Sequence, residues 1–323
     1  MPEEEKRLSA DGSPEPDLLD EHYKTVVTAI ADGDVVPFLG AGVNLCGRPE
    51  GASYQRGRYL PSGGELAEYL AQQFGYTGSD KKDLLRVSQY AAVMRGSAPL
   101  YRRLHSIFDA DYPPTPLHRS LAALPSLLRE KGYPPYQLIV TTNYDDVLEN
   151  ALREAAQPFD LVSYVAEGEH RGKFLHRLPN DEVRLIEKPN EYRDLSLDQR
   201  TVLLKIHGAV DRKKADQDSY VITEDHYTDY LTRTDISNLI PVKLAEKLRH
   251  SSYLFLGYSL RDWNLRVILR RIWGEQQLTY QSWAVQLAPT TLDQKFWGKH
   301  GVEIVDQSLE DYVAALSEGM KAL

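Results

Sequence analysis

Short apolar runs alternate with helical patterns along most of this 323-residue chain, and this alternation limits the fold more than any other feature. The apolar runs have the length and composition of buried strands. They cover residues 35–39, 137–141, 202–206, 253–256, 283–287 and 302–305. In the helical patterns between them, apolar residues recur every three or four positions. The sequence therefore predicts an α/β fold, in which a doubly wound, Rossmann-like and mostly parallel sheet carries helices on both faces.

Three segments depart from a regular alternation. Pro37 stands inside the first apolar run, which indicates a strand that begins late or lies near an edge of the sheet. Residues 220–222 are expected to form a short strand before a helix that Thr223 caps. Residues 160–200 are polar and typical of hairpins, and their place in the sheet is left open.

The helical patterns suggest how the chain is organised. Helices are expected over residues 20–32, 62–74, 83–95, 99–108, 117–130, 145–156, 236–249 and 262–273, and from residue 308 onward. Ser62-Gly63-Gly64-Glu65 has the form of a capping box at the start of the second. We predict that residues 62–134 are a helical insertion or subdomain that packs beside the sheet and covers the ligand. Residues 1–17, rich in acids and proline, are expected to be a disordered acidic tail, which leaves 18–323 as the folded domain.

Charge and cysteine content argue against several classes of protein. Lys and Arg number 38 against 47 Asp and Glu, and a net charge of −9 disfavours direct binding of nucleic acid. The single cysteine, Cys46, cannot form an intramolecular disulfide or a four-cysteine zinc site, and it fits a reducing cytoplasm. No apolar run approaches the roughly 20 residues that span a bilayer, so we expect a cytoplasmic protein without a membrane partner.

Four expected strands end in residues that suit a ligand site. Ligands of doubly wound sheets bind beyond the carboxyl ends of the strands. These ends read Gly40-Ala41-Gly42, Thr141-Thr142-Asn143-Tyr144-Asp145, His207-Gly208 and Gly257-Tyr258-Ser259. Taken singly, each also fits a structural role, as a glycine turn, a helix cap or a hydrogen-bonded histidine. Four such ends spread across one sheet predict a crevice for a dinucleotide.

The residue types suggest what each strand end could do. Two glycines after a strand allow the backbone to approach a phosphate closely. Asn143 precedes the expected helix, where its side chain should face the crevice. His207 has an ordinary pKa near neutrality and suits a general base. Asp146 is better explained as a helix cap that complements the helix dipole.

In their order and positions these residues resemble the sirtuin-like NAD-consuming domains. The sirtuin pattern has a Gly-Ala-Gly loop, then Thr-Gln-Asn-Ile-Asp, then His-Gly, then Gly-Thr-Ser. The resemblance is closest to the bacterial branch, which has Thr-Thr-Asn-Tyr-Asp and often a segment like residues 221–227. It covers about residues 35 to 260. It implies an NAD glycohydrolase of antiphage, abortive-infection defence that cleaves NAD to nicotinamide and ADP-ribose.

The resemblance implies a role for each matched residue. Catalysis would fall to Asn143, which orients the ribose and the attacking water, to His207 as the base, and to Asp145 beside the ribose or the nicotinamide. NAD would be held by Gly40, Ala41, Gly42, Asn44, Thr142, Gly257 and Ser259. Among these, Asn44 stands where sirtuins usually have serine.

The resemblance also implies NAD as the substrate, no zinc, a homo-oligomer and a separate regulatory partner, such as a translocating ATPase or an Argonaute-like protein. Deacylation is disfavoured because this chain lacks the four-cysteine ribbon of sirtuin deacetylases. A non-catalytic sensor of NAD or ADP-ribose and an ADP-ribosyl transferase stay open as alternatives. A Rossmann oxidoreductase fits least, because its third fingerprint glycine is missing.

Overall fold

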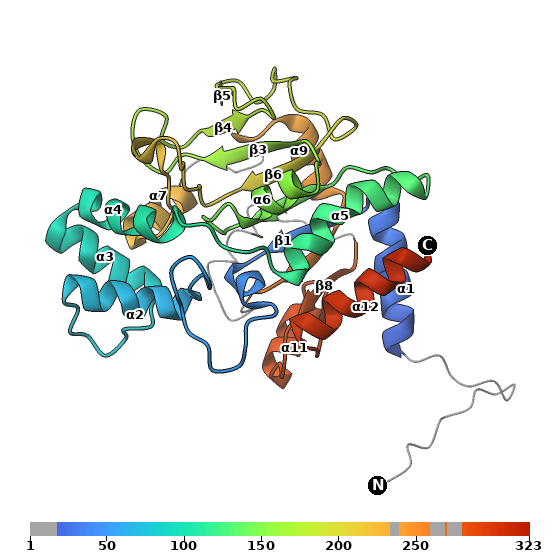
Figure 1. The fold of residues 1–323 in the computed structure, drawn as a ribbon, viewed down its shortest axis with the longest axis horizontal. Coiled ribbons are helices and arrows are strands. Elements are labelled where there is room, and N and C mark those ends of the chain that lie inside the picture. The colour runs from blue at the N-terminus through green and yellow to red at the C-terminus, as the bar shows by residue number, and fades with distance from the viewer. Residues whose placement is uncertain (1–17, 233–238, 259–268, 270–279) are drawn as a thin grey trace, which may run out of the picture.

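The structure is a computed structural model that describes residues 18–232, 239–258, 269 and 280–323 (Figure 1). The predicted tail over residues 1–17, the helix expected over 262–273 and the site residue Ser259 lie outside the described residues.

The described residues form one nine-stranded sheet in the order β5-β4-β3-β6-β2-β1-β7-β8-β9. The strands are β1 (Val35–Leu39), β2 (Leu138–Thr141), β3 (Phe159–Tyr164), β4 (Phe174–Arg177), β5 (Val183–Ile186), β6 (Thr201–Lys205), β7 (Ser252–Leu256), β8 (Ser282–Val285) and β9 (Val302–Val305). Strands β3, β6, β2, β1, β7, β8 and β9 run parallel, and the antiparallel pairings are those of β3 with β4 and of β4 with β5. The predicted, mostly parallel α/β fold is therefore confirmed, and the polar segment 160–200 supplies the antiparallel end of the sheet.

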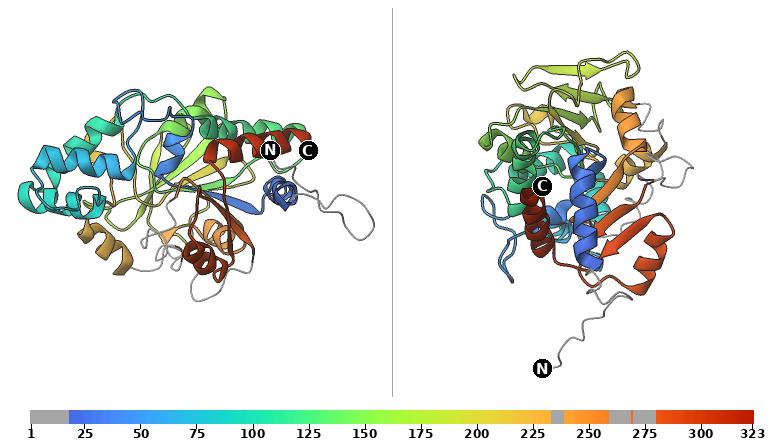
Figure 2. Two further views of the ribbon diagram at one scale, coloured as in Figure 1. Left: turned by 90° about the horizontal axis from the view of Figure 1, so that it is seen from below. Right: turned by 90° about the vertical axis from the view of Figure 1, so that its right-hand side faces the viewer.

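Helices cover both faces of the sheet (Figure 2). One face packs on α1 (Leu18–Ala31), α5 (Pro116–Glu130), α6 (Val147–Glu154) and α12 (Leu309–Ala322). The other face packs on α7 (Glu224–Thr232), α9 (Val242–Arg249) and α11 (Thr291–Gly298). Strands β2 and β6 lie on one side of β1, whereas β7, the next strand in the chain after β6, lies on the other side of β1. Such a reversal of strand order opens a crevice at the carboxyl ends of the strands.

Three further helices form a separate layer at one end of the sheet. These are α2 (Gly63–Phe74), α3 (Leu84–Arg95) and α4 (Ser97–Phe108), drawn at the left of Figure 1. They share their own apolar core. The side chains of Tyr220 and Ile222, from the segment between β6 and α7, also pack into this core. The capping box predicted for α2 is present, because Ser62 and Glu65 bond each other's backbone amides. Helix α5, within the range 62–134 expected as a helical subdomain, packs on the sheet layer with α6 and α12.

Of the two alternatives predicted for the proline-containing strand, a late start or an edge position, the edge position is wrong. Strand β1 lies between β2 and β7 and is buried along its whole length. Its pairing with β2 begins only at Phe38, the residue after Pro37. Pro37 has no amide proton to donate, but it stands before the first residue of β1 that pairs with β2. A central strand can therefore contain this proline.

The short strand expected over residues 220–222 is absent from the described sheet. Tyr220, Val221 and Ile222 are buried, but Tyr220 and Ile222 pack into the core of α2–α4. Their apolar character reflects this packing and not a place in the sheet. Thr223 caps α7 as predicted, since its Oγ1 accepts a hydrogen bond from the His226 amide.

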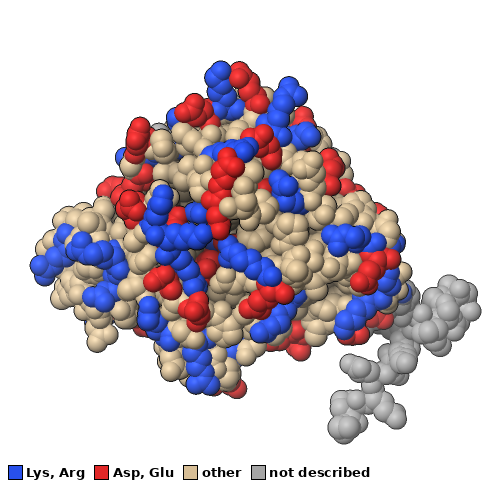
Figure 3. Space-filling model, turned by 45° about the horizontal axis from the view of Figure 1, so that its top comes forward, with Lys and Arg blue, Asp and Glu red and all other residues tan. Residues whose placement is uncertain are grey.

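The surface is charged and mixed. On the face drawn in Figure 3, basic and acidic side chains are interspersed rather than gathered into one broad field of either sign. No helix in the described part of the chain is long and apolar enough to cross a membrane.

Candidate active site

A cavity of about 440 Å³ opens at the carboxyl ends of β1, β2, β6 and β7. Eight of the predicted site residues line it: Ala41, Gly42, Asn44, Thr142, Asn143, Asp145, His207 and Gly257. The structure therefore brings together residues more than 200 positions apart in the chain. Of the other two, Gly40 does not line the cavity but accepts a hydrogen bond from Asn143, which does, and Ser259 is outside the described residues.

Glycine is required where the β1 and β7 loops cross. A Cβ on Gly42 would lie 2.7 Å from the Gly257 carbonyl oxygen, and one on Gly257 would lie 2.3 Å from the Val43 nitrogen. Gly257 also has a φ of +71°, which side chains rarely tolerate. The Gly40 amide donates to Leu256 O at 2.9 Å, and the Gly42 amide donates to Gly257 O at 2.8 Å. These two amides fasten the loops together, which leaves the Ala41 amide as the donor without a partner among the described residues.

The start of α2 forms the opposite rim of the cavity. Ser62, Gly63 and Gly64 line it, and a Cβ added to either glycine would meet nothing within 4 Å. The first amides of a helix lack partners within the helix and carry a partial positive charge, so they favour anions. From the sequence, these residues were predicted only to form a capping box. The pattern of a capping box does not indicate that a cavity lies beside it.

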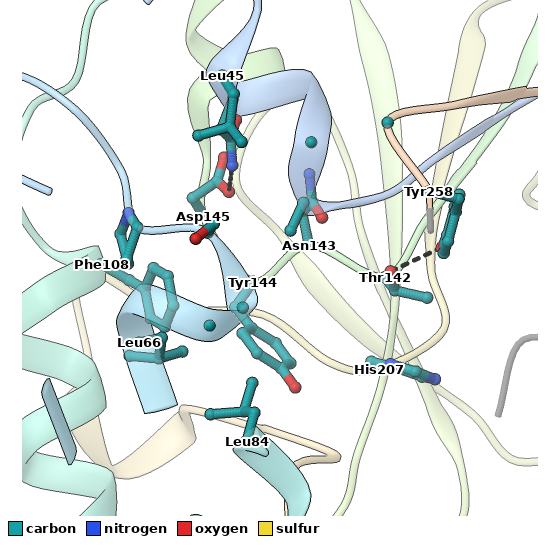
Figure 4. A pocket seen from close by; sticks show the side chains of 18 of the residues that line it. Leu45, Leu66, Leu84, Phe108, Thr142, Asn143, Tyr144, Asp145, His207 and Tyr258 are labelled. Carbon is teal, nitrogen blue, oxygen red and sulfur yellow. Dashed lines mark hydrogen bonds between the residues drawn. The ribbon is translucent and has the colours of Figure 1, made fainter. Parts of the chain in front are cut away.

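Asn143 is held in a turn beyond β2. Its backbone amide donates to Thr141 Oγ1 at 3.0 Å, and its side-chain Nδ2 donates to Gly40 O at 3.1 Å. The neighbouring Thr142 hydroxyl shares a hydrogen bond of 2.7 Å with the Tyr258 hydroxyl (Figure 4). These contacts tie the β2 turn to the loops after β1 and β7. The amide of Asn143 is thus fixed at the centre of the crevice.

Asn44 and Asp145 form a buried pair on another side of the cavity. Asn44 Nδ2 donates to Asp145 Oδ2 at 2.8 Å, and Asp145 Oδ1 accepts from the Val147 amide at 3.2 Å. The Asn44 side chain is only 8% exposed, and its Oδ1 has no partner among the described residues. Where sirtuins carry serine, this chain therefore uses an asparagine to orient the carboxylate. Asp146, expected as a helix cap, makes no such bond and instead pairs with Arg212 at 2.8 Å.

A buried ion pair supports this turn from behind. Lys205 and Glu149 are 2% and 3% exposed, and Lys205 Nζ lies 2.6 Å from Glu149 Oε1. The same ammonium donates to the Asp145 backbone carbonyl. Burial raises the pKa of Glu149, and the charge of Lys205 opposes that rise. The pair thus joins β6, α6 and the Asp145 turn, and sequence analysis had used Lys205 only as part of a strand.

His207 is buried against the rings of Tyr227 and Tyr230, which meet it edge-on. Its Nδ1 lies 3.4 Å from the Tyr227 hydroxyl, and its Nε2 has no partner among the described residues. Burial lowers the pKa of His207 to about 3, so the ring is neutral near pH 7. His207 thus brings a neutral imidazole to the wall of the cavity.

Other residues that line the cavity were missed by sequence analysis. They are Leu45, Pro61, Ser62, Gly63, Gly64, Leu66, Leu84, Phe108, Tyr144, Tyr227 and Tyr258. In Figure 4 the side chains of Leu66, Leu84 and Phe108 gather on one side, away from Thr142 and His207. Tyr144 and Tyr258 lie inside motifs that the analysis quoted, and they could have been included. Leu66, Leu84 and Phe108 belong to amphipathic helices whose pattern gives no sign of a ligand.

Fold and cavity together define an α/β protein with a nucleotide-sized site at the point where its strand order reverses. Comparison with protein families gives a more specific answer. The model of the SIR2-like domain matches residues 137–305, just over half of the chain. The chain belongs to this family. The resemblance to sirtuin-like domains inferred from the motifs is thereby confirmed.

Curated relatives extend over more of the chain. Defense-associated sirtuin 2 of Bacillus subtilis is 23% identical over 291 residues, which cover 88% of this chain and 24% of that protein. The NAD(+) hydrolase ThsA of Enterococcus faecium is 27% identical over 249 residues, covering 76% of this chain and 41% of the relative. ThsA of Acinetobacter baumannii (strain 532279) is 26% identical over 253 residues, with the same two shares. The chain spans less than half the length of these relatives.

Among the described residues, no group of three or more His, Cys, Asp and Glu side chains is placed to hold a metal ion.

Proposed function

We propose that this chain is an NAD glycohydrolase, which cleaves NAD to nicotinamide and ADP-ribose. The observation that carries the proposal is that His207 and Asn143, whose side-chain amide is held by Gly40 O, line the same cavity. The relatives named NAD(+) hydrolase support the choice of substrate.

Cleavage of the bond between nicotinamide and ribose requires a well-positioned substrate and water more than it requires a covalent intermediate with the enzyme. In NAD the nicotinamide is a pyridinium, so it leaves as a neutral molecule when its bond to ribose C1′ breaks and it takes the bonding electrons. The ribose passes through a state with positive charge at C1′, and a water oxygen then bonds to that carbon. The water loses one proton, which ends in the solvent. A site that orients the ribose and the water supplies most of the required acceleration.

His207 would act on the water or on a ribose hydroxyl. With its pKa lowered to about 3, the imidazole is a weak base that accepts a hydrogen bond throughout the neutral range. It would take the proton only as the new bond to C1′ forms, when the water becomes acidic. Asn143 would orient the same ribose, because its side chain is held by Gly40 O at the centre of the crevice.

Other parts of the cavity wall would each contact a different part of the NAD molecule. The Ala41 amide and the start of α2 would face the pyrophosphate, since both offer amide donors without partners in the described structure. Leu66, Leu84 and Phe108 would provide an apolar surface for the nicotinamide ring. Gly257 and Ser259 would stand on the adenosine side, and Asp145, oriented by Asn44, would lie beside the ribose or the nicotinamide.

We further propose that the activity serves antiphage defence in the cytoplasm. A relative named as a defense-associated sirtuin supports this setting. An enzyme that destroys NAD must be held inactive in healthy cells, so control by homo-oligomerisation or by a partner, such as a translocating ATPase or an Argonaute-like protein, is part of the proposal.

Product analysis tests the proposal. The purified protein is incubated with NAD, and products are separated by chromatography. Nicotinamide and ADP-ribose should appear in equal amounts, whereas NADH should stay intact because its dihydropyridine is a poor leaving group. ADP-ribose attached to protein would indicate a transferase instead. Tight binding of NAD with no products, in buffer and in extract of infected cells, would indicate a sensor.

A further inference from the structure

A second cavity of about 340 Å³ lies beside the first and shares Asn44 with it. One wall is the loop from Cys46 to Leu60, and the other is the linker from Tyr112 to Pro116 with the first turns of α5. The proposed function leaves this cavity and most of that loop without a role. Val147 closes its inner end, next to the turn that carries Asp145.

The charged side chains that line this cavity are all arginines: Arg48, Arg58 and Arg119. Arg48 is neutralised, because its guanidinium pairs with Glu65 and also donates to the carbonyls of Ala52 and Leu60. Arg58 and Arg119 have no ion-pair partner among the described residues. None of the described residues that line this cavity is acidic, and Glu310 Oε1 accepts from the Gly47 amide at 2.8 Å. Two arginines therefore face the cavity uncompensated, in a protein with a net charge of −9.

The walls are built in advance of any ligand. Arg48 and Glu65 hold the loop in place, and Gln55 and Tyr59 exchange backbone hydrogen bonds of 3.1 and 2.9 Å within it. The Arg58 guanidinium lies over the Tyr59 ring, 5.1 Å from its centroid. On the facing wall, Pro113, Pro114 and Pro116 restrict the backbone. A preformed cavity loses less entropy on binding than a flexible surface does.

We propose that this second cavity binds a phosphate-bearing nucleotide, a mono- or diphosphate. Two guanidiniums without carboxylate partners match a dianionic phosphate, which arginine recognises through paired N–H donors. The exposed Pro113 and Pro116 offer apolar surface for a base or a sugar. The volume is that of a small-molecule site. This binding does not depend on whether the chain cleaves NAD.

Isothermal titration calorimetry with AMP as the probe tests the site, with adenosine as the uncharged comparison. The test variant is Arg58→Ala/Arg119→Ala, whose side chains are exposed, so that the fold should be kept. The matched control is Arg129→Ala/Arg153→Ala, which removes the same charge at two exposed arginines elsewhere. Thermal unfolding of all three proteins confirms that they are folded.

We expect AMP to bind the unmodified protein and the control alike, and to bind the test variant at least roughly tenfold more weakly. Adenosine should bind at least about tenfold more weakly than AMP to the unmodified protein. The proposal is overturned if AMP does not bind, if adenosine binds as well as AMP, or if the test variant keeps full affinity.

Discussion

At the scale of single residues, the site depends on side chains that fix one another before any ligand arrives. Asn44 orients Asp145, the Gly40 carbonyl orients Asn143, and Tyr227 lies beside His207. The first two contacts join residues from different strand ends, and the third joins a strand end to α7. The functional groups therefore keep their geometry only while the loops stay together.

Substitution of Asn44 tests this dependence. In Asn44→Asp, a second carboxylate would replace the amide 2.8 Å from Asp145 Oδ2, and repulsion would turn Asp145 away. In Asn44→Ala, a hydrogen bond to a charged group is lost, a change of about 1.5–3 kcal/mol. We expect kcat/KM for NAD to fall roughly tenfold or more in Asn44→Ala, and further in Asn44→Asp. Steady-state kinetics would refute this role for Asn44 if both variants kept the unmodified rate.

The candidate residues could be named from the sequence, whereas the residues that contact them could not. The motifs at four strand ends were enough to name Asn143, Asp145 and His207, because strand ends meet at one edge of a parallel sheet. The contact between Asn44 and Asp145 joins residues 101 positions apart, and nothing in either local sequence indicates it. The lowered pKa of His207 arises from burial, which depends on Tyr227 and Tyr230 from a later helix.

At the scale of elements, β6 and α6 are joined by the Lys205–Glu149 pair under the floor of the site. Both charges are buried, so each depends on the other for compensation. The ammonium also donates to the Asp145 carbonyl, and in this way a strand, a helix and the turn that carries Asp145 share one contact.

Removal of one partner should therefore cost far more than removal of both. In Lys205→Met the carboxylate of Glu149 is left buried and alone, and we expect a loss of about 3–5 kcal/mol in the free energy of unfolding. The double variant Lys205→Met/Glu149→Leu should recover most of that loss. Urea unfolding of the four proteins of this cycle provides the measurement. A double variant whose loss equals the sum of the two single losses would show that the pair is not coupled.

The order of the elements was predictable, whereas two details of their placement were not. Strand-like apolar runs identified six of the seven parallel strands, and β3 was left open because Asp160 and Ser163 interrupt its apolar character. Pro37 misled the analysis, since the offset between β1 and β2 that accommodates it is a property of pairing. Residues 220–222 misled it as well, because an apolar run buried against helices has the same composition as a buried strand.

At the scale of the whole molecule, two buried histidines make stability depend on pH. Burial lowers the pKa of His207 to about 3, and burial likewise lowers that of His118, where Asp145 opposes the shift and Lys205 adds to it. The unfolded chain takes up protons on these rings below pH 6.5, while the folded protein does not. Their contribution to stability is thus complete above pH 6.5 and is lost as the pH falls toward the folded-state values.

His118 allows this to be measured outside the cavity. We expect the free energy of unfolding to drop between pH 7 and pH 5, with about 2 kcal/mol of the drop caused by His118. In His118→Gln, which cannot gain a proton, the drop should be smaller by that amount. Urea unfolding at both pH values gives the comparison, and an identical drop in the two proteins would exclude His118 as its source.

The central claim is that the cavity at the sheet's carboxyl edge binds NAD and cleaves it with His207. The most direct test measures both NAD affinity and nicotinamide release for the unmodified protein, His207→Ala and, as a control, the exposed His300→Ala. The account predicts similar affinity in all three proteins and at least a roughly hundredfold slower release only in His207→Ala. Release at the unmodified rate by a folded His207→Ala protein would contradict it.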